Sequence, residues 1–228
     1  MKRVKTLTTG IFLLSQAFSG AAFAASVTLA GTSVDFTFDD ALLGLFGPAS
    51  VSGNTLYFTP VAFKAQSLNG AGYALTSDTM NVQVAAHSDW LFSSLGLTER
   101  GSYTLLGSGS SADVAGQMRV FDVAQPLTDL AANIQPASPL DQVGLATHNW
   151  TAGASTDLSA WNTAQTINVT VQNLLLASTS INPSLALVQK NFVGVTAVMA
   201  PVPEAETYAM MLAGLGLVGF ALARRRAA

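Results

Sequence analysis

Apolar and polar residues alternate with a period of two along much of this chain. The alternation is clearest where polar side chains separate Val34, Phe36 and Phe38, and it recurs over residues 80–84 and 167–172. Successive side chains of a β-strand point to opposite faces of a sheet. The pattern therefore predicts strands that bury one face and expose the other.

Turn-forming residues divide these runs at short intervals. Gly53-Asn54 separates two alternating segments, as in a β-hairpin. Glycines and serines over residues 107–111 separate two longer alternating segments. Strands that recur about every 8–12 residues with such turns are typical of β-sandwiches. We predict one all-β ectodomain over residues 25–200, an antiparallel β-sandwich or jelly-roll-like fold, with its last strand at 192–200.

Residues 126–165 are less regular than the rest of this ectodomain. Pro126, Pro136 and Pro139 interrupt them, and the sequence LTDLAANI at 127–134 could form a short helix. The ectodomain has the length of one domain. We therefore interpret the segment as a long insertion or crossover within that domain.

The N-terminal residues have the composition of a secretory signal. The basic residues come first: Lys2, Arg3 and Lys5. An apolar stretch centred on 11–14 follows, and then Ala22 and Ala24 occupy the small-residue positions of a cleavage site. We predict a signal peptide over residues 1–24, so that the mature chain begins at Ala25. The alternative is an uncleaved N-terminal anchor.

A second apolar segment lies near the C-terminus. Residues 207–223 carry no charge and are followed by three basic residues: Arg224, Arg225 and Arg226. As a helix this segment would rise about 25 Å, which is short but sufficient for a membrane span. Arginines at one end favour the cytoplasmic side for that end. We predict a transmembrane helix here; the alternative is a buried C-terminal core helix.

The sequence GLGLVG at 214–219 also matches the glycine fingerprint of a dinucleotide-binding turn. That fingerprint requires a preceding strand and an acidic residue about 20 positions later. The residues before it are not a β-branched run, and no acidic residue follows. We therefore assign these glycines to the membrane helix, where small residues allow close helix packing, and we expect no cofactor.

The whole tail resembles a PEP-CTERM sorting domain. Pro203 and Glu204 match the first two residues of its Pro-Glu-Pro motif, and Ala205 replaces the second proline. The predicted apolar helix and the arginine cluster follow. The resemblance covers residues 201–226. It implies an exopolysaccharide-producing Gram-negative bacterium, and a tail that is recognised and processed by exosortase, a membrane-embedded cysteine protease. The protein would be anchored in the inner membrane before processing, and then reach the cell surface or the extracellular space.

Charge and cysteine content narrow the function classes. Between residues 25 and 203 the chain has 4 basic and 11 acidic residues, a net charge of 4 − 11 = −7. Such a surface disfavours binding to nucleic acid and to anionic lipid. The chain contains no cysteine, which excludes disulfides, thiol catalysis and cysteine-based metal sites.

The candidate catalytic residues carry little specific signal. His87, Ser88 and Asp89 are adjacent, and neighbouring residues of a strand point to opposite faces, so they do not form a triad. Carboxylate pairs for glycoside hydrolysis are conceivable among the aspartates at 35–40, or between Asp89 and Glu99. Solvated strand-face carboxylates are the commoner explanation. We therefore predict no catalytic residues.

Two kinds of ligand site remain as weaker hypotheses. Asp35, Asp39 and Asp40 could contribute oxygen ligands to a calcium ion at a strand end, although no EF-hand loop is present. Aromatic residues could form a platform for sugar rings, with Trp150 and Trp161 placed in the irregular segment. The full set of candidates is Trp90, Trp150, Trp161, Tyr57, Tyr73 and Tyr103.

The sequence thus predicts a non-enzymatic, exported surface or extracellular-matrix protein. Its expected role is structural or adhesive and linked to exopolysaccharide. The alternatives are a carbohydrate-binding module, which exposed coplanar tryptophans would favour, and a secreted glycan hydrolase, which would need two carboxylates facing each other across a cleft.

Overall fold

A computed structural model describes residues 26–161, 163–202 and 210–217. The predicted signal peptide, residues 1–24, and Ala25 lie outside the described residues. The sandwich consists of β-strands, the turns and loops that connect them, and two short 3₁₀ helices, η1 (Asp40–Leu42) and η2 (Gly44–Phe46). The strands are β1 (Ser26–Ala30), β2 (Val34–Asp39), β3 (Ala49–Ser52), β4 (Thr55–Phe58), β5 (Lys64–Leu68), β6 (Gly72–Ala86), β7 (Trp90–Leu106), β8 (Ser110–Asp122), β9 (Asp129–Pro136), β10 (His148–Asp157), β11 (Thr166–Thr179) and β12 (Leu185–Pro201).

These strands form two antiparallel sheets packed face to face. Sheet A has the order β1-β2-β6-β11-β8-β9, and sheet B has the order β10-β7-β12-β4-β3, with β5 also paired to β12. The sheets are joined along one edge by two residue pairs between β9 and β10. Along the opposite edge, no described strand bridges β1 and β3. The predicted antiparallel sandwich is confirmed, but eleven strands on one nearly closed path, with β5 added beside β12, differ from an eight-stranded jelly roll.

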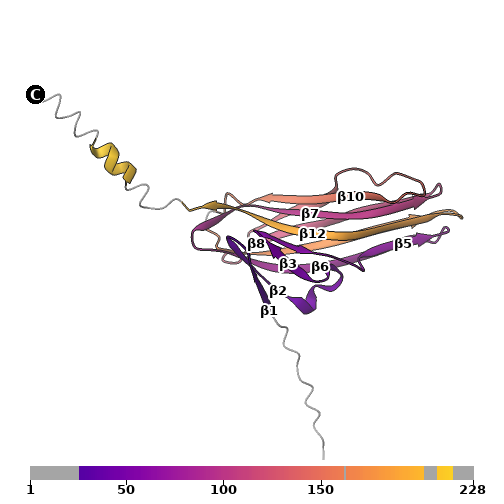
Figure 1. Ribbon diagram of the computed structural model, residues 1–228, viewed down its shortest axis with the longest axis horizontal. Helices are drawn as coiled ribbons and strands as arrows, with labels where there is room; N and C mark the ends of the chain where they lie inside the picture. Colours follow the sequence, from indigo (N-terminus) through magenta and orange to yellow (C-terminus); the bar gives the residue numbers. More distant parts are fainter. Residues whose placement is uncertain (1–25, 162, 203–209, 218–228) are drawn as a thin grey trace, which may run out of the picture.

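The long strands cross repeatedly between the two sheets. From β6 to β12 the chain visits A, B, A, A, B, A and B in turn, so that sheet neighbours such as β6 and β11 are far apart in sequence. Figure 1 shows the resulting elongated sandwich, with the end of β12 on the left and the tip of β5 at the other end. Chain reversals therefore gather at the two ends.

The apolar half of the alternating pattern fills the space between the sheets. Met80, Val82 and Val84 of β6 face inward, and so do the isoleucine and two valines of β11 that pair with them. Burying each such side chain contributes about 1.5–3 kcal/mol. The predicted inner faces at Val34–Phe38 and over 167–171 are confirmed.

The prediction of a short helix at 127–134 is wrong, because Asp129–Pro136 form strand β9. This strand pairs with β8 over residues 129–134 and with β10 at its end. Pairing with both neighbours satisfies the backbone N–H and C=O groups that a helix would satisfy within itself. The tertiary context therefore determines that this segment is a strand. The irregular segment as a whole supplies the junction between the two sheets.

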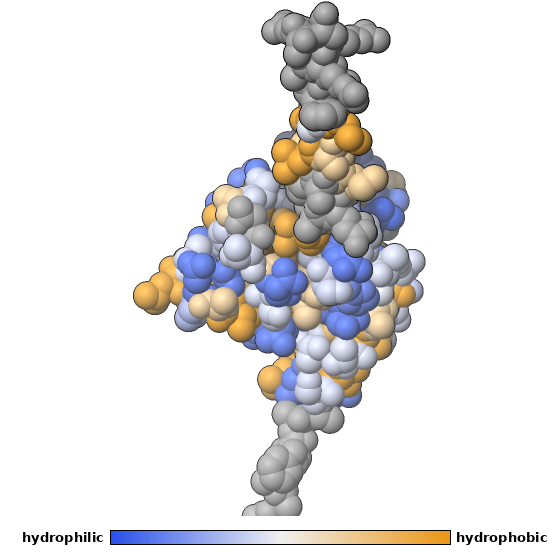
Figure 2. Space-filling view, turned by 90° about the vertical axis from the view of Figure 1, so that its left-hand side faces the viewer, coloured by the Kyte–Doolittle hydropathy of each residue, from blue (hydrophilic) through white to orange (hydrophobic). Residues whose placement is uncertain are grey.

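The described part of the tail, residues 210–217, is helical. Its methionines and leucines are exposed, and the segment shows orange and pale colours in Figure 2. Among the described residues, no helix is long and apolar enough to span a membrane. The remainder of the predicted span at 207–223, and the arginines at 224–226, lie outside the described residues.

Candidate functional site

The outer face of sheet A carries cross-strand rows of amide and hydroxyl side chains, here called the amide face. In one row the register aligns Thr79, Gln172, Gln117 and Asn133, and in the next row Asn81, Thr170 and Arg119. A third row aligns Gln83, Asn168, Phe121 and Asp129. Alternation along four strands therefore places one polar surface on β6, β11, β8 and β9.

Hydrogen bonds between neighbouring strands order these side chains. The Thr170 hydroxyl donates to Asn81 Oδ1 at 2.7 Å, and Gln83 Nε2 donates to Asn168 Oδ1 at 3.4 Å. Because each amide has two donor hydrogens and two acceptor lone pairs, these single bonds leave hydrogen-bonding capacity free for a ligand.

A cation and an aromatic ring add to this face. Arg119 forms an ion pair with Asp129, with 2.7 Å between Nη2 and Oδ2, and its guanidinium lies 5.0 Å from the centre of the Phe121 ring. A depression of about 540 Å³ lies beside Phe121. A second depression of about 300 Å³ extends along Arg119 and Gln172.

A second polar cluster lies inside the sandwich, and the sequence analysis missed it. Asn173 points inward from sheet A, and Glu99 and Lys190 point inward from sheet B; their exposed fractions are 0%, 0% and 1%. Lys190 Nζ donates to Glu99 Oε2 at 2.5 Å and also to Asn173 Oδ1. Both charged residues occupy positions where the alternation along β7 and β12 calls for apolar residues, and this signal could have revealed them.

Local features of strand β12 and its neighbours hold Lys190 in place. A β-bulge between residues 190 and 192 shifts the register, so that Lys190 and Val193 both face the core. The ammonium group lies 5.2 Å from the ring centre of Phe63 and 5.9 Å from that of Trp150. Burial lowers the pKa of Lys190, and Glu99 opposes this shift by its charge and hydrogen bond.

The hypothesis of a sugar platform that includes Trp150 is wrong, because Trp150 belongs to the core. Its ring is 95% covered, lies against Gly101 and donates from Nε1 to the Gln189 carbonyl at 3.2 Å. Tyr103 is also buried, and Trp161 packs against the core. Trp90 is half-buried at the start of β7.

Two of the candidate tyrosines do reach the surface. Tyr73 is exposed on β6, and Tyr57 lies on the outer face of sheet B. The Tyr57 ring is nearly parallel to that of Phe192, at an angle of 18° and 6.2 Å between centres, and Arg100 lies 5.3 Å from the Phe192 ring centre. This aromatic pair is a smaller exposed feature than the amide face.

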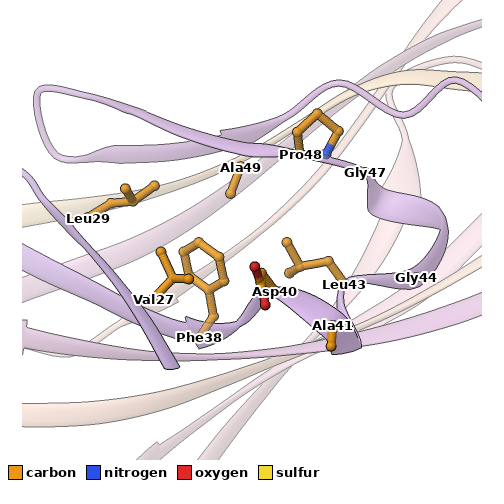
Figure 3. A pocket seen from close by; sticks show the side chains of 10 residues that line it. All are labelled: Val27, Leu29, Phe38, Asp40, Ala41, Leu43, Gly44, Gly47, Pro48 and Ala49. Atoms are coloured by element: carbon orange, nitrogen blue, oxygen red, sulfur yellow. The ribbon is translucent and has the colours of Figure 1, made fainter. Parts of the chain in front are cut away.

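The three calcium candidates serve separate contacts. Asp35 pairs with His87 Nε2 at 3.1 Å, and Asp39 caps η1 by accepting a hydrogen bond from Ala41 N at 3.0 Å. Asp40 lines a mostly apolar pocket of about 530 Å³ at the open edge, shown in Figure 3 with Phe38 and Leu43 at its base. Across the described ranges, no group of three or more His, Cys, Asp or Glu residues could hold a metal ion.

Asp89 and Glu99, one carboxylate pair considered for hydrolysis, are far apart. Asp89 lies in the turn before β7, and Glu99 follows ten positions later within that strand. Because a strand rises about 3.3 Å per residue, the two residues are about 30 Å apart. His87 lies in the same turn, where it contacts Asp35 and does not contribute to a triad.

The tail leaves the sandwich directly from a paired strand. Pro201 is the last residue of β12 and pairs with Trp90, and Val202 N donates to the Asp89 carbonyl at 2.9 Å. Figure 2 views this end of the molecule, where polar residues surround scattered apolar ones. The predicted processing residues Pro203, Glu204 and Ala205 lie outside the described residues.

Comparison with known families gives one match, to the PEP-CTERM protein-sorting motif, over residues 201–226. The chain carries a PEP-CTERM sorting tail. Its match begins at the final residue of β12 and includes Ala205. The PEP-CTERM tail implies an exported protein of a Gram-negative bacterium that is processed at the membrane, and the motif is the recognised substrate signal for exosortase.

Other comparisons say little about the ectodomain. No curated protein sequence matches the chain. Among solved structures, TmCBM61 in complex with β-1,4-galactotriose is 7% identical, with a TM-score of 0.19 over 57% of this chain and 86% of that one. A carbohydrate-binding module from the β-sandwich superfamily is 8% identical, with a TM-score of 0.23 over 73% and 96%. The VP2 subviral particle of infectious bursal disease virus is 10% identical, with a TM-score of 0.24 over 70% and 48%. These low TM-scores support no functional assignment for the ectodomain.

Proposed function

We propose that this protein is a non-enzymatic component of the cell surface or extracellular matrix, and that its sandwich adheres to exopolysaccharide through the amide face. The PEP-CTERM tail would bring it to exosortase at the inner membrane, and processing would release the ectodomain outward. The observation that carries the adhesive role is the set of aligned amide and hydroxyl rows across four strands of sheet A.

The chemistry of the amide face suits a neutral polysaccharide. Sugar hydroxyls both donate and accept hydrogen bonds, as do the amides of Asn and Gln. The Phe121 ring beside the depression provides an apolar surface for a sugar ring. The ectodomain carries a net charge of 4 − 11 = −7, and Asp129 neutralises Arg119, so an acidic polysaccharide would be repelled.

Binding to polysaccharide from the native host's matrix tests the proposal. Affinity electrophoresis of the purified protein in gels containing that polysaccharide should show retardation. The double variant Asn81→Ala/Thr170→Ala removes a hydrogen-bonded pair from the centre of the amide face. The dissociation constant derived from the retardation should rise at least tenfold, which corresponds to about 1.4 kcal/mol of binding free energy.

A matched pair on the opposite sheet provides the control. Thr55 and Thr196 share a hydrogen bond of 2.9 Å on the outer face of sheet B, so Thr55→Ala/Thr196→Ala should leave retardation unchanged. Equal loss in both double variants would contradict a role for the amide face. Binding that survives in the first variant but disappears with Phe192→Ala would assign the ligand to the aromatic pair on sheet B.

The sorting step has its own test, which is independent of the ligand. The intact mass of protein recovered from the host's surface fraction should correspond to a chain that begins near Ala25 and ends near Glu204. A mass that includes Ala228 would show that the PEP-CTERM tail is retained, and the protein would then be a membrane-anchored ectodomain.

A further inference from the structure

The buried cluster of Glu99, Lys190 and Asn173 is only half satisfied. Lys190 Nζ donates to both neighbours. Glu99 Oε1 and Asn173 Nδ2 are two of the three buried side-chain polar atoms that lack a hydrogen-bond partner within the described residues. A partly satisfied buried network is less stable than an apolar core, so each such atom requires an explanation. A reaction that removes Nδ2 and the charge of the amine would eliminate one of these unpartnered atoms and the buried ion pair.

The three groups are arranged for an acyl transfer. The Lys190 amine is a nucleophile once it loses a proton, and burial, which lowers the pKa of Lys190, favours the neutral form. Glu99 Oε2 lies 2.5 Å from Nζ and can accept that proton. Since Nζ contacts Oδ1 of the Asn173 carboxamide, the amine is held beside the electrophilic Cγ atom.

We propose that the side chains of Lys190 and Asn173 become joined by an isopeptide bond, which the folded protein forms by itself with Glu99 as general base and general acid. This assignment depends on the interior of the sandwich and is independent of the proposed polysaccharide binding. It makes Glu99 a catalytic residue for a single intramolecular turnover.

The bond changes of this reaction balance within the protein. Glu99 takes a proton from the Lys190 ammonium group, and neutral Nζ attacks Asn173 Cγ to give a tetrahedral intermediate. Glu99 then relays a second proton from Nζ to Nδ2, the bond between Cγ and Nδ2 breaks, and ammonia leaves. The new amide nitrogen keeps one proton, and Glu99 retains the proton that it first accepted. No oxidant, metal or second reactant is consumed.

The product has a clear structural consequence. The amine charge and the unpartnered Nδ2 disappear, and the new amide N–H faces Glu99. The bond would tie β11 of sheet A to β12 of sheet B, and β12 is the strand that leads into the PEP-CTERM tail. A chain without cysteine thereby gains a covalent link between its two sheets.

Mass spectrometry of the denatured full chain tests the proposal directly. Processing determines the two termini of the recovered chain, and the expected mass is calculated for those termini. The measured mass should be lower than this value by one molecule of ammonia. Chymotrypsin cuts after leucines between Asn173 and Lys190, so the digest should contain two peptides joined through these side chains. Trypsin should fail to cut after Lys190.

Variants separate the bond from other losses of ammonia. Asn173→Ala and Lys190→Arg should both have their full calculated masses. Glu99→Gln, which is nearly isosteric and keeps both reacting groups, should accumulate as unlinked protein. Lys64→Arg is the matched control, because Lys64 is the other lysine of the ectodomain and lies exposed on β5, and it should keep the ammonia loss.

Several results would overturn the proposal. A wild-type protein with full mass and separate peptides would show that no bond forms. An ammonia loss that maps to Asn69-Gly70, a sequence prone to succinimide formation, would have a different origin. A Glu99→Gln protein that links as completely as wild type would remove the role assigned to Glu99.

Discussion

Replacement of Lys190 by methionine tests whether Glu99 is held as a buried charge by its partner. The substitution keeps a long, flexible side chain against Phe63 and Trp150 but removes the amine. The Glu99 carboxylate, which is fully buried, then loses its donor at Oε2 while Oε1 already has no partner in the described structure. Breaking a buried ion pair from one side costs about 3–5 kcal/mol.

The second substitution makes the test specific. Adding Glu99→Gln to Lys190→Met removes the charge but leaves a polar amide in the core, which costs about 1–3 kcal/mol when unsatisfied. The difference between the cost of the unpaired charge and the cost of the unsatisfied amide is about 2 kcal/mol. Glu99→Gln should therefore raise the free energy of unfolding of the Lys190→Met protein by about that amount. Neither variant has the Lys190 amine, so neither can form the proposed bond and the comparison measures the charge alone.

Urea unfolding followed by tryptophan fluorescence measures the effect, because Trp150 lies beside the substituted side chain. The unfolding midpoint should rise from the single to the double variant with the slope unchanged. As a control, Asp141→Asn in the Lys190→Met background changes an exposed carboxylate and should alter the free energy of unfolding by less than about 0.5 kcal/mol. If Glu99→Gln has no effect on the Lys190→Met protein or destabilises it further, the reasoning about an uncompensated buried charge is refuted.

Three further predictions concern the same core. Gly101→Ala should destabilise the protein by about 2 kcal/mol or more and change the fluorescence of Trp150, because a Cβ atom at Gly101 would overlap that ring and a backbone carbonyl; an unchanged spectrum and midpoint would contradict this. In Glu99→Gln, burial keeps the pKa of Lys190 below its ordinary 10.5, so between these two pKa values the unfolded state binds more protons than the folded state. The free energy of unfolding should therefore rise with pH towards 10.5, by up to about 1.4 kcal/mol per pH unit. Urea titrations at several pH values that give a flat or falling profile would refute this. Phe46→Ala should cost about 3–5 kcal/mol in thermal or urea unfolding, because its buried ring packs edge-on against two other phenylalanines; a cost below about 1 kcal/mol would show that the site can collapse.

The alternating pattern by itself determined most strands and the direction in which their side chains point. Met80, Val82 and Val84 are buried as predicted, and the Asn and Gln residues between them line the outer face. This works because the two-residue period of a strand is a local property of the backbone. The turns at Gly53-Asn54 and 107–109 were equally readable, since glycine adopts their positive φ angles.

The same sequence could not reveal which strands are neighbours. Residues 129–136 form a strand and no helix, because β8 pairs with most of this segment and β10 pairs with its end. The amide face exists only because the chain returns several times to sheet A, which aligns residues as distant as Asn81 and Thr170. Aromatic composition likewise suggested a platform that the packing of Trp150 over Gly101 rules out.

The sequence was sufficient to identify the PEP-CTERM tail and most of the residues that face the core, because sorting motifs and strand periodicity are both encoded by neighbouring residues. The alternation along β7 and β12 assigns inward positions to Glu99 and Lys190, a signal that the sequence analysis did not use. Their meeting with each other and with Asn173 was decided by the tertiary structure: Glu99 and Lys190 are 91 positions apart and become neighbours only when β7 pairs with β12. Asn173 then comes from the facing sheet, because two sheets must pack together to bury their apolar faces.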